Sequence, residues 1–170
     1  MNKEALLSKH AYFKMVHGVT LRLIAAFADI DLDYRPKPDL RSVRELITHV
    51  YGMLGTFSEG MRRGQLTAEI ENNATPETEA GRAQVATLKT VKDLQEFAGK
   101  NFQAIEETLA AMTDEQLAKP LESPFGTYPT WMYFAFAYDE HWHHRGQLYT
   151  YVRLIGKEPP MLYDYENSPA

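Results

Sequence analysis

The chain has 170 residues, of which 44% are hydrophobic and 24% are charged, and its formal net charge at pH 7 is −5. These values are typical of a globular protein, and the length favours a single domain over residues 1–170 with a sizeable core. The acidic balance argues against a nucleic-acid binder, because no basic stripe is present to neutralise phosphates.

The chain contains no cysteine, which excludes disulfide bonds, thiolate metal sites and a cysteine nucleophile. Residues 1–4 lead into an amphipathic segment and not into an apolar signal core. No apolar run approaches the ~20 residues that span a bilayer. These features predict a soluble, cytoplasmic protein with no membrane partner.

The first predicted helix covers residues 4–28, where apolar residues recur at helical intervals. His10 and His17 lie on it, and we expect each to be a solvated or hydrogen-bonded helix histidine and not a ligand. A loop follows at residues 29–38, because two prolines and short polar residues break the pattern.

The second predicted helix begins with a capping box, in which Ser42 caps the backbone amide of Glu45 and the Glu45 side chain reaches back. It continues to about Met61 and carries His49 on its apolar face. A lone histidine there is more often a hydrogen-bonded core residue than a ligand. The histidines of the last helix favour the ligand interpretation for His49.

A polar connector is predicted for residues 62–78, and at this length it either contains short helical turns or lies over a site. A short helix over residues 79–87 precedes a third long helix over residues 90–112. A capped turn at residues 113–117 then leads to a predicted loop at residues 121–129, which is rich in proline and glycine.

The last predicted helix covers residues 130–155 and ends at Gly156, after which two prolines prevent its continuation. Gly146 in its middle would let another backbone come close. The aromatic tail at residues 161–165 is expected to pack on the body, and the chain from Glu166 onward is expected to fray. Four long helices without an alternating strand pattern predict an α bundle.

The last helix holds three of the six histidines within four positions, at His141, His143 and His144. On a helical wheel, His144 points with the apolar stripe toward the interior, with Glu140 about 40° to one side and His141 about 60° to the other. A carboxylate and an imidazole on a buried face are costly unless compensated, and metal coordination is the commonest compensation.

A third ligand is needed for a metal site, and His49 on the facing helix is the natural candidate. Two ligands one turn apart and one from a second helix leave a coordination position for water or substrate. Nitrogen and oxygen ligands suit zinc, nickel or iron(II). His143 points away and is expected in packing or at a dimer surface. In the alternative interpretation Glu140, His143 and Arg145 form only a solvated face with local ion pairing.

Four motifs follow one another along the chain: Arg-Ser-Val-Arg-Glu-Leu at the start of the second helix, Pro-Phe-Gly, His-His-Arg-Gly-Gln-Leu, and Arg-Leu-Ile-Gly-Lys-Glu-Pro-Pro. In these motifs most of the chain resembles the DinB-like (DinB/YfiT) metalloenzyme family, and the His-His-Arg-Gly-Gln run is the most specific part. The resemblance implies a four-helix bundle, usually a homodimer, with a mononuclear divalent metal held by three histidines.

Carried onto this sequence, the resemblance makes His49 and His144 two of the metal ligands. The third family histidine, four residues before His144, is replaced here by Glu140. Glutamate also ligates divalent metals, although it changes the charge of the site by one unit. His141 is the alternative third ligand, and loss of metal binding is a further alternative. Zinc or nickel is the first expectation for the metal, followed by iron or manganese.

Relatives in the wider superfamily are thiol-dependent S-transferases and isomerases. The resemblance therefore implies a small-molecule substrate and a low-molecular-weight thiol such as bacillithiol, mycothiol or glutathione. One hypothesis is a cytoplasmic metal-dependent transferase or hydrolase, in which the metal lowers the pKa of a bound thiol or water. The alternative, motivated by Glu140, is a non-catalytic, stress-related helical dimer that binds a small molecule or a protein partner.

Overall fold

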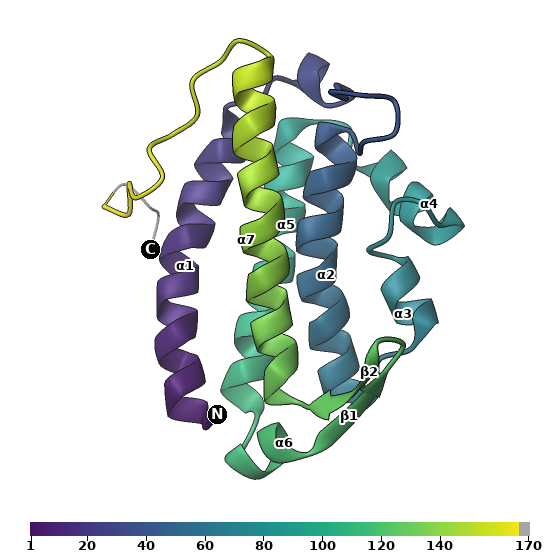
Figure 1. Cartoon of the computed structure of the whole chain (residues 1–170), viewed down its shortest axis with the longest axis vertical. Coiled ribbons are helices and arrows are strands. Elements are labelled where there is room, and N and C mark those ends of the chain that lie inside the picture. Colours follow the sequence, from purple (N-terminus) through teal and green to yellow (C-terminus); the bar gives the residue numbers. More distant parts are fainter. Residues whose placement is uncertain (167–170) are drawn as a thin grey trace.

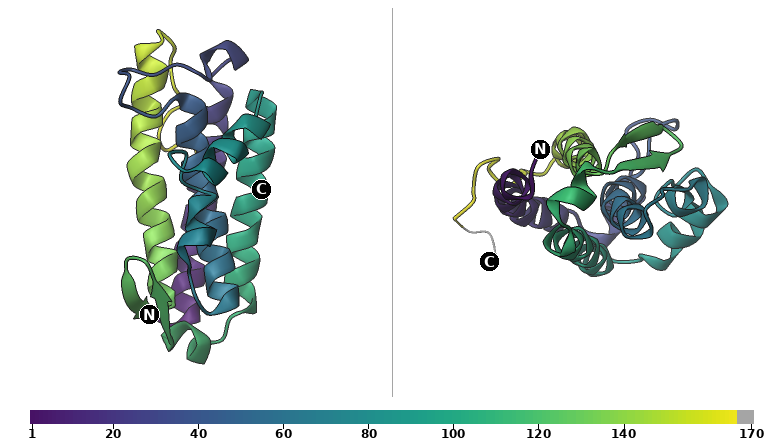
Figure 2. Two further views of the ribbon diagram at one scale, coloured as in Figure 1. Left: turned by 90° about the vertical axis from the view of Figure 1, so that its right-hand side faces the viewer. Right: turned by 90° about the horizontal axis from the view of Figure 1, so that it is seen from below.

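Four long helices form a bundle in the computed structural model, which describes residues 1–166 (Figure 1). These helices are α1 (Lys3–Ala25), α2 (Val43–Arg63), α5 (Val91–Ala111) and α7 (Trp131–Leu154). Figure 2 shows α1 and α2 at opposite corners of the bundle, and each packs against both α5 and α7. The predicted all-α bundle is confirmed, and the helix bounds agree with the predicted ranges to within about one turn.

The connector between α2 and α5 returns the chain to the other end of the bundle. Figure 1 shows that these two neighbouring helices run in the same direction, so a short turn cannot join them. The returning segment contains the short helices α3 (Ala68–Asn72) and α4 (Glu79–Thr87), which lie outside the bundle beside α2. The short helical turns predicted for the connector are therefore present.

Local sequence signals define the ends of the long helices. The Ser42 hydroxyl accepts a hydrogen bond from the Glu45 amide at 3.2 Å, and the Glu45 carboxylate accepts from the Ser42 amide at 2.8 Å, which confirms the predicted capping box. Gly64 ends α2 and Gly156 follows α7, both with positive φ (74° and 79°), the left-handed conformation that favours glycine.

A β-hairpin occupies the segment for which the sequence predicted a loop, so that prediction is wrong. Strands β1 (Pro120–Ser123) and β2 (Gly126–Pro129) pair antiparallel after the short helix α6 (Asp114–Ala118). Each strand is only four residues long and has proline at its outer end, so no alternating pattern was visible. The hairpin is joined to α7 by a 3.0 Å hydrogen bond that the Tyr133 hydroxyl donates to the Leu121 carbonyl.

Three histidines from α1 and α7 lie in the core of the bundle. His10 and His17 are buried, with Nδ1 atoms 3.2 Å and 2.9 Å from the hydroxyls of Tyr138 and Tyr51. The expectation that both are hydrogen-bonded helix histidines is confirmed. His141 is fully buried beside them.

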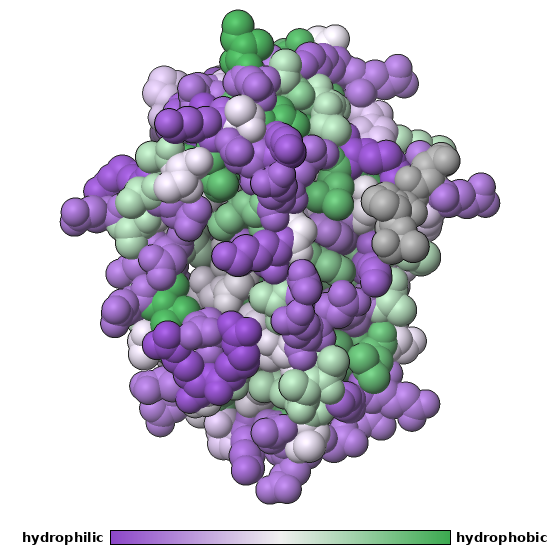
Figure 3. Space-filling model, turned by 180° about the vertical axis from the view of Figure 1, so that it is seen from behind, coloured by the Kyte–Doolittle hydropathy of each residue, from purple (hydrophilic) through white to green (hydrophobic). Residues whose placement is uncertain are grey.

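The surface of the described part of the molecule gives two further findings. Within residues 1–166 no helix is both long and apolar enough to cross a membrane. The face opposite to that of Figure 1 is covered largely by hydrophilic side chains (Figure 3).

The end of the described chain folds back along α1. The tail packs on the body as predicted, because the hydroxyls of Tyr165 and Tyr12 lie 3.1 Å apart and Arg22 pairs with Asp164 at 3.3 Å. The predicted fraying begins at Glu166, and residues 167–170 of that segment lie outside the described part.

Candidate metal centre

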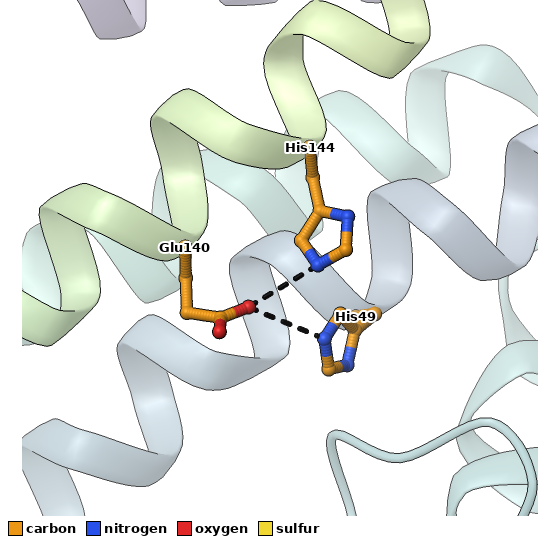
Figure 4. Close-up of side chains that lie close together, drawn as sticks. All are labelled: His49, Glu140 and His144. Atoms are coloured by element: carbon orange, nitrogen blue, oxygen red, sulfur yellow. Dashed lines mark ion pairs between the residues drawn. The ribbon is translucent and has the colours of Figure 1, made fainter.

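Two neighbouring helices bring a carboxylate and two imidazoles together (Figure 4). His49 comes from α2, and Glu140 and His144 come from successive turns of α7. Glu140 Oε2 lies 3.2 Å from His144 Nε2 and 3.5 Å from His49 Nε2. One ligand atom from each residue lies within 4.8 Å of the other two, so the three residues predicted from the sequence form one cluster.

The second nitrogen of each imidazole is held by an oxygen acceptor. His49 Nδ1 lies 2.8 Å from the Ala74 carbonyl oxygen, and His144 Nδ1 lies 2.9 Å from the Gln147 side-chain oxygen. Because these oxygens only accept, both Nδ1 atoms carry hydrogen. A neutral imidazole then presents the lone pair of Nε2 to the cluster, which is the arrangement found in metal-ligating histidines.

The donor set requires a positive charge at its centre. Contacts with His144 and then with His49 hold the pKa of the Glu140 carboxyl well below its usual range, so this side chain is ionised at neutral pH. Lone pairs on two Nε2 atoms would repel that carboxylate unless protons or a metal ion lie between them. Two donors bound tetrahedrally to zinc are about 3.3 Å apart. The observed separations of 3.2 and 3.5 Å therefore fit a divalent metal.

The cluster is enclosed on the histidine side and open on the glutamate side. The side chains of His49 and His144 are 12% and 10% exposed, whereas that of Glu140 is 39% exposed. A cavity of about 290 Å³ adjoins Glu140. Its wall is aromatic and comes from α2, the hairpin and α7: Phe57, Phe125, Tyr128 and Phe136, with Asp139 beside Glu140.

The structure does not bring the alternative third ligand to the cluster. His141 Nε2 lies 3.0 Å from the Thr20 hydroxyl of α1, and the residue is fully buried. The rotation of ~60° from His144 that the helical wheel predicts turns His141 toward α1, away from His49. His143 is exposed and contacts Gln147, so the expectation that it points away is confirmed.

Two groups that orient the imidazoles were missed in the sequence. Gln147 lies three residues after His144, and this spacing on a helix is a signal that could have identified it. The Ala74 carbonyl is a backbone group of the connector, and no sequence pattern marks it. Its role depends on how the connector packs against α2.

Comparison of the chain with known proteins identifies the family to which it belongs. The profile of the DinB family matches residues 1–169. The crystal structure of a DinB-like protein from Bacillus subtilis, YjoA, is similar in fold, with a TM-score of 0.68 and 23% sequence identity. The match covers 90% of this chain and 96% of that chain. No curated protein shows a significant match. The near-complete profile match confirms the resemblance seen in the motifs, and the chain belongs to the DinB family.

Proposed function

We propose that the protein is a metal-dependent enzyme that holds one divalent ion through His49, Glu140 and His144. Its reaction would be a transfer or hydrolysis on a small molecule, with a low-molecular-weight thiol or water as the nucleophile. One observation carries the proposal: three donor atoms converge while both Nδ1 atoms are held by oxygen acceptors.

The chain's own groups prepare this site for a divalent cation. Ala74 and Gln147 fix the imidazole tautomers, and Glu140 supplies one negative charge from the open side. Nitrogen and oxygen donors without sulfur suit zinc or nickel first, and iron or manganese next. A bound ion of this kind would lower the pKa of a thiol or water at a position that the protein leaves free.

The aromatic cavity beside Glu140 supports a substrate with an apolar body. Phe57 is buried at its base, and Phe125 is exposed at its edge. Aromatic walls with a few polar groups at one end are typical of small-molecule sites. An apolar electrophile bound there would be close to the open side of the cluster.

Metal content tests the assignment of the ligands. We expect one divalent ion per wild-type chain in elemental analysis, and its loss in His49→Ala and His144→Ala, because two remaining donors hold zinc-like ions poorly. Glu96→Ala on α5 serves as the control, since this exposed carboxylate lies outside the cluster and the variant should keep the ion. Equal metal content in all four proteins would refute the proposed centre.

A second candidate function follows from the ion pairs of Glu140 with both histidines. If the imidazoles carry protons, the cluster is a structural ion-pair network in a non-catalytic helical dimer that binds a small molecule or a protein. A panel of electrophiles, assayed with bacillithiol, mycothiol and glutathione, separates the two functions. Conjugation that rises with metal occupancy supports the enzyme; a protein that retains no divalent ion and conjugates no electrophile supports the second candidate.

A further inference from the structure

A second cavity lies on the opposite face of α7, between that helix, α1 and the C-terminal tail. Its volume is about 800 Å³, within the range of small-molecule sites. Trp142 and Tyr149 of α7 line it together with Tyr163 of the tail. Figure 1 shows the tail returning from the end of α7 alongside α1. Successive positions on α7 place the lining residues of this face roughly 100–200° from His144, so the cavity is separate from the metal cluster.

Arg145 lines this cavity and is only 7% exposed. One of its Nη atoms donates to the Leu162 carbonyl at 3.1 Å and to the Tyr149 hydroxyl at 3.4 Å, and the guanidinium lies over the Tyr149 ring. Its buried Nε has no hydrogen-bond partner, and within residues 1–166 no carboxylate forms an ion pair with it. A buried positive charge without a counter-ion is costly, so this guanidinium favours an anion.

The charges around Arg145 also favour an anion. The positive charges of Arg145, Arg22 and Arg153 all act on the Tyr149 hydroxyl. Arg22 pairs with Asp164 at 3.3 Å, so these two charges offset each other. Of the charged side chains that line the cavity, Arg145 and Arg153 are cationic and Glu158 is anionic, so the lining carries a net positive charge.

Gly146 keeps the cavity open. A Cβ atom at this position would meet no other atom within 4 Å, so the predicted close approach of another backbone is wrong. Glycine in the middle of a helix destabilises it relative to alanine. Gly146 also lines the cavity, and a larger side chain there would extend into it. Arg145 and Gly146 belong to the His-His-Arg-Gly-Gln run, but the metal cluster uses neither side chain.

We propose that this cavity binds a small organic anion with an aromatic body, whose carboxylate, sulfonate or phosphate group pairs with Arg145. Trp142, Tyr149 and Tyr163 supply flat apolar surfaces for the body, and the guanidinium supplies the positive charge and an N–H donor for the acidic group. The proposal does not depend on a metal being bound at His49, Glu140 and His144.

Two dyes of nearly equal shape test the proposal. 8-Anilinonaphthalene-1-sulfonate carries the acidic group, and N-phenyl-1-naphthylamine lacks it. On the full-length, metal-loaded protein we expect saturable binding of the sulfonate at one site, with energy transfer from tryptophan because Trp142 lines the cavity. We also expect the sulfonate to bind at least tenfold more tightly than the neutral dye.

Three variants then locate the binding site. Arg145→Met should weaken binding of the sulfonate at least tenfold and leave the neutral dye unaffected, since methionine keeps most of the packing. Gly146→Leu should abolish binding of both dyes, and the open space at its Cβ allows it to fold. Arg82→Met on α4 is the control for loss of an exposed arginine and should change neither dye.

The proposal fails if folded Arg145→Met and Gly146→Leu bind the sulfonate like wild type, or if Arg82→Met weakens it equally. Circular dichroism and metal content verify that each variant is folded. Light scattering measures the oligomeric state and so tests whether a second copy of the chain occupies the cavity. A change of oligomeric state in Gly146→Leu with unchanged dye binding would make the cavity an interface between copies and overturn the proposal.

Discussion

Gln147 links the side chains of two histidines on α7. Its side-chain oxygen accepts from His144 Nδ1 at 2.9 Å, and its nitrogen lies 3.1 Å from His143 Nε2. The second contact orients the amide so that its oxygen faces His144. The tautomer of His144, and hence the direction of its Nε2 lone pair, therefore depends on a residue that touches no other member of the cluster.

Replacing Gln147 tests this dependence. Gln147→Leu removes the acceptor for His144 Nδ1, and loss of such an outer partner typically lowers metal affinity by about 10- to 100-fold. Gln147→Glu keeps an acceptor oxygen and should retain most of the affinity. Competition with a chromophoric chelator measures both. Affinity of Gln147→Leu equal to that of wild type would show that Gln147 does not orient the ligand.

Packing of the connector on α2 controls the other histidine. Gly52 lies one turn after His49, and a Cβ atom there would come within 3.0 Å of the Ala74 side chain and 3.1 Å of its backbone. The absence of a side chain at Gly52 thus lets the connector approach α2 and brings the Ala74 carbonyl to His49 Nδ1. The position of the Ala74 carbonyl beside His49 therefore also depends on the length of the connector and on its packing against α2.

Gly52→Ala should push Ala74 away from α2 and weaken metal binding through His49. Gly99→Ala on α5 is the matched control, because a Cβ there meets nothing within 4 Å. It should stabilise the protein by up to ~1 kcal/mol, since alanine is the better helix former. Urea denaturation and metal titration of both variants provide the test. Unchanged metal affinity in Gly52→Ala would show that packing of the connector on α2 does not influence metal binding.

The whole bundle encloses a line of neutral histidines. Burial, followed by the charges of His10 and Lys14, lowers the pKa of His17 to about 4. Burial also lowers the pKa values of His10 and His141. In the unfolded chain all three would titrate near their ordinary value of about 6.5. Because the unfolded state then binds more protons than the folded state, stability falls as the pH decreases from about 7 toward 4.

His17 alone should lower the free energy of unfolding by about 2 kcal/mol between pH 7 and pH 5. His17→Phe keeps a ring against Phe102, on which the imidazole stacks at 4.0 Å, but removes the titrating group. The loss of stability between the two pH values should shrink by that amount in His17→Phe. It should stay the same in Leu7→Ala, which changes an exposed side chain of α1 that carries no titrating group. Identical pH dependence of His17→Phe and wild type would contradict the assignment.

The sequence by itself determined the long helices, the capping box of the second helix and two members of the cluster, His49 and His144, and it left the third member between Glu140 and His141. Helical periodicity and capping are local, so Ser42 with Glu45 and the stop at Gly156 could be recognised without a structure. The i and i+4 spacing of Glu140 and His144 is equally local. Identifying His49 required one further inference, that the apolar faces of the second and last helices, each of which carries a candidate ligand, pack against each other.

Only the tertiary structure decided which of Glu140 and His141 faces His49, because the helical wheel leaves both near His144 and the position of α2 relative to α7 selects one. It also decided the hairpin, whose strands are too short to show a pattern, and the Ala74 contact, which joins residues 25 positions apart. The cavity beside Arg145 likewise exists only where the tail folds back on α7. Contacts between distant segments depend on how whole helices pack, and local spacing carries no record of that packing.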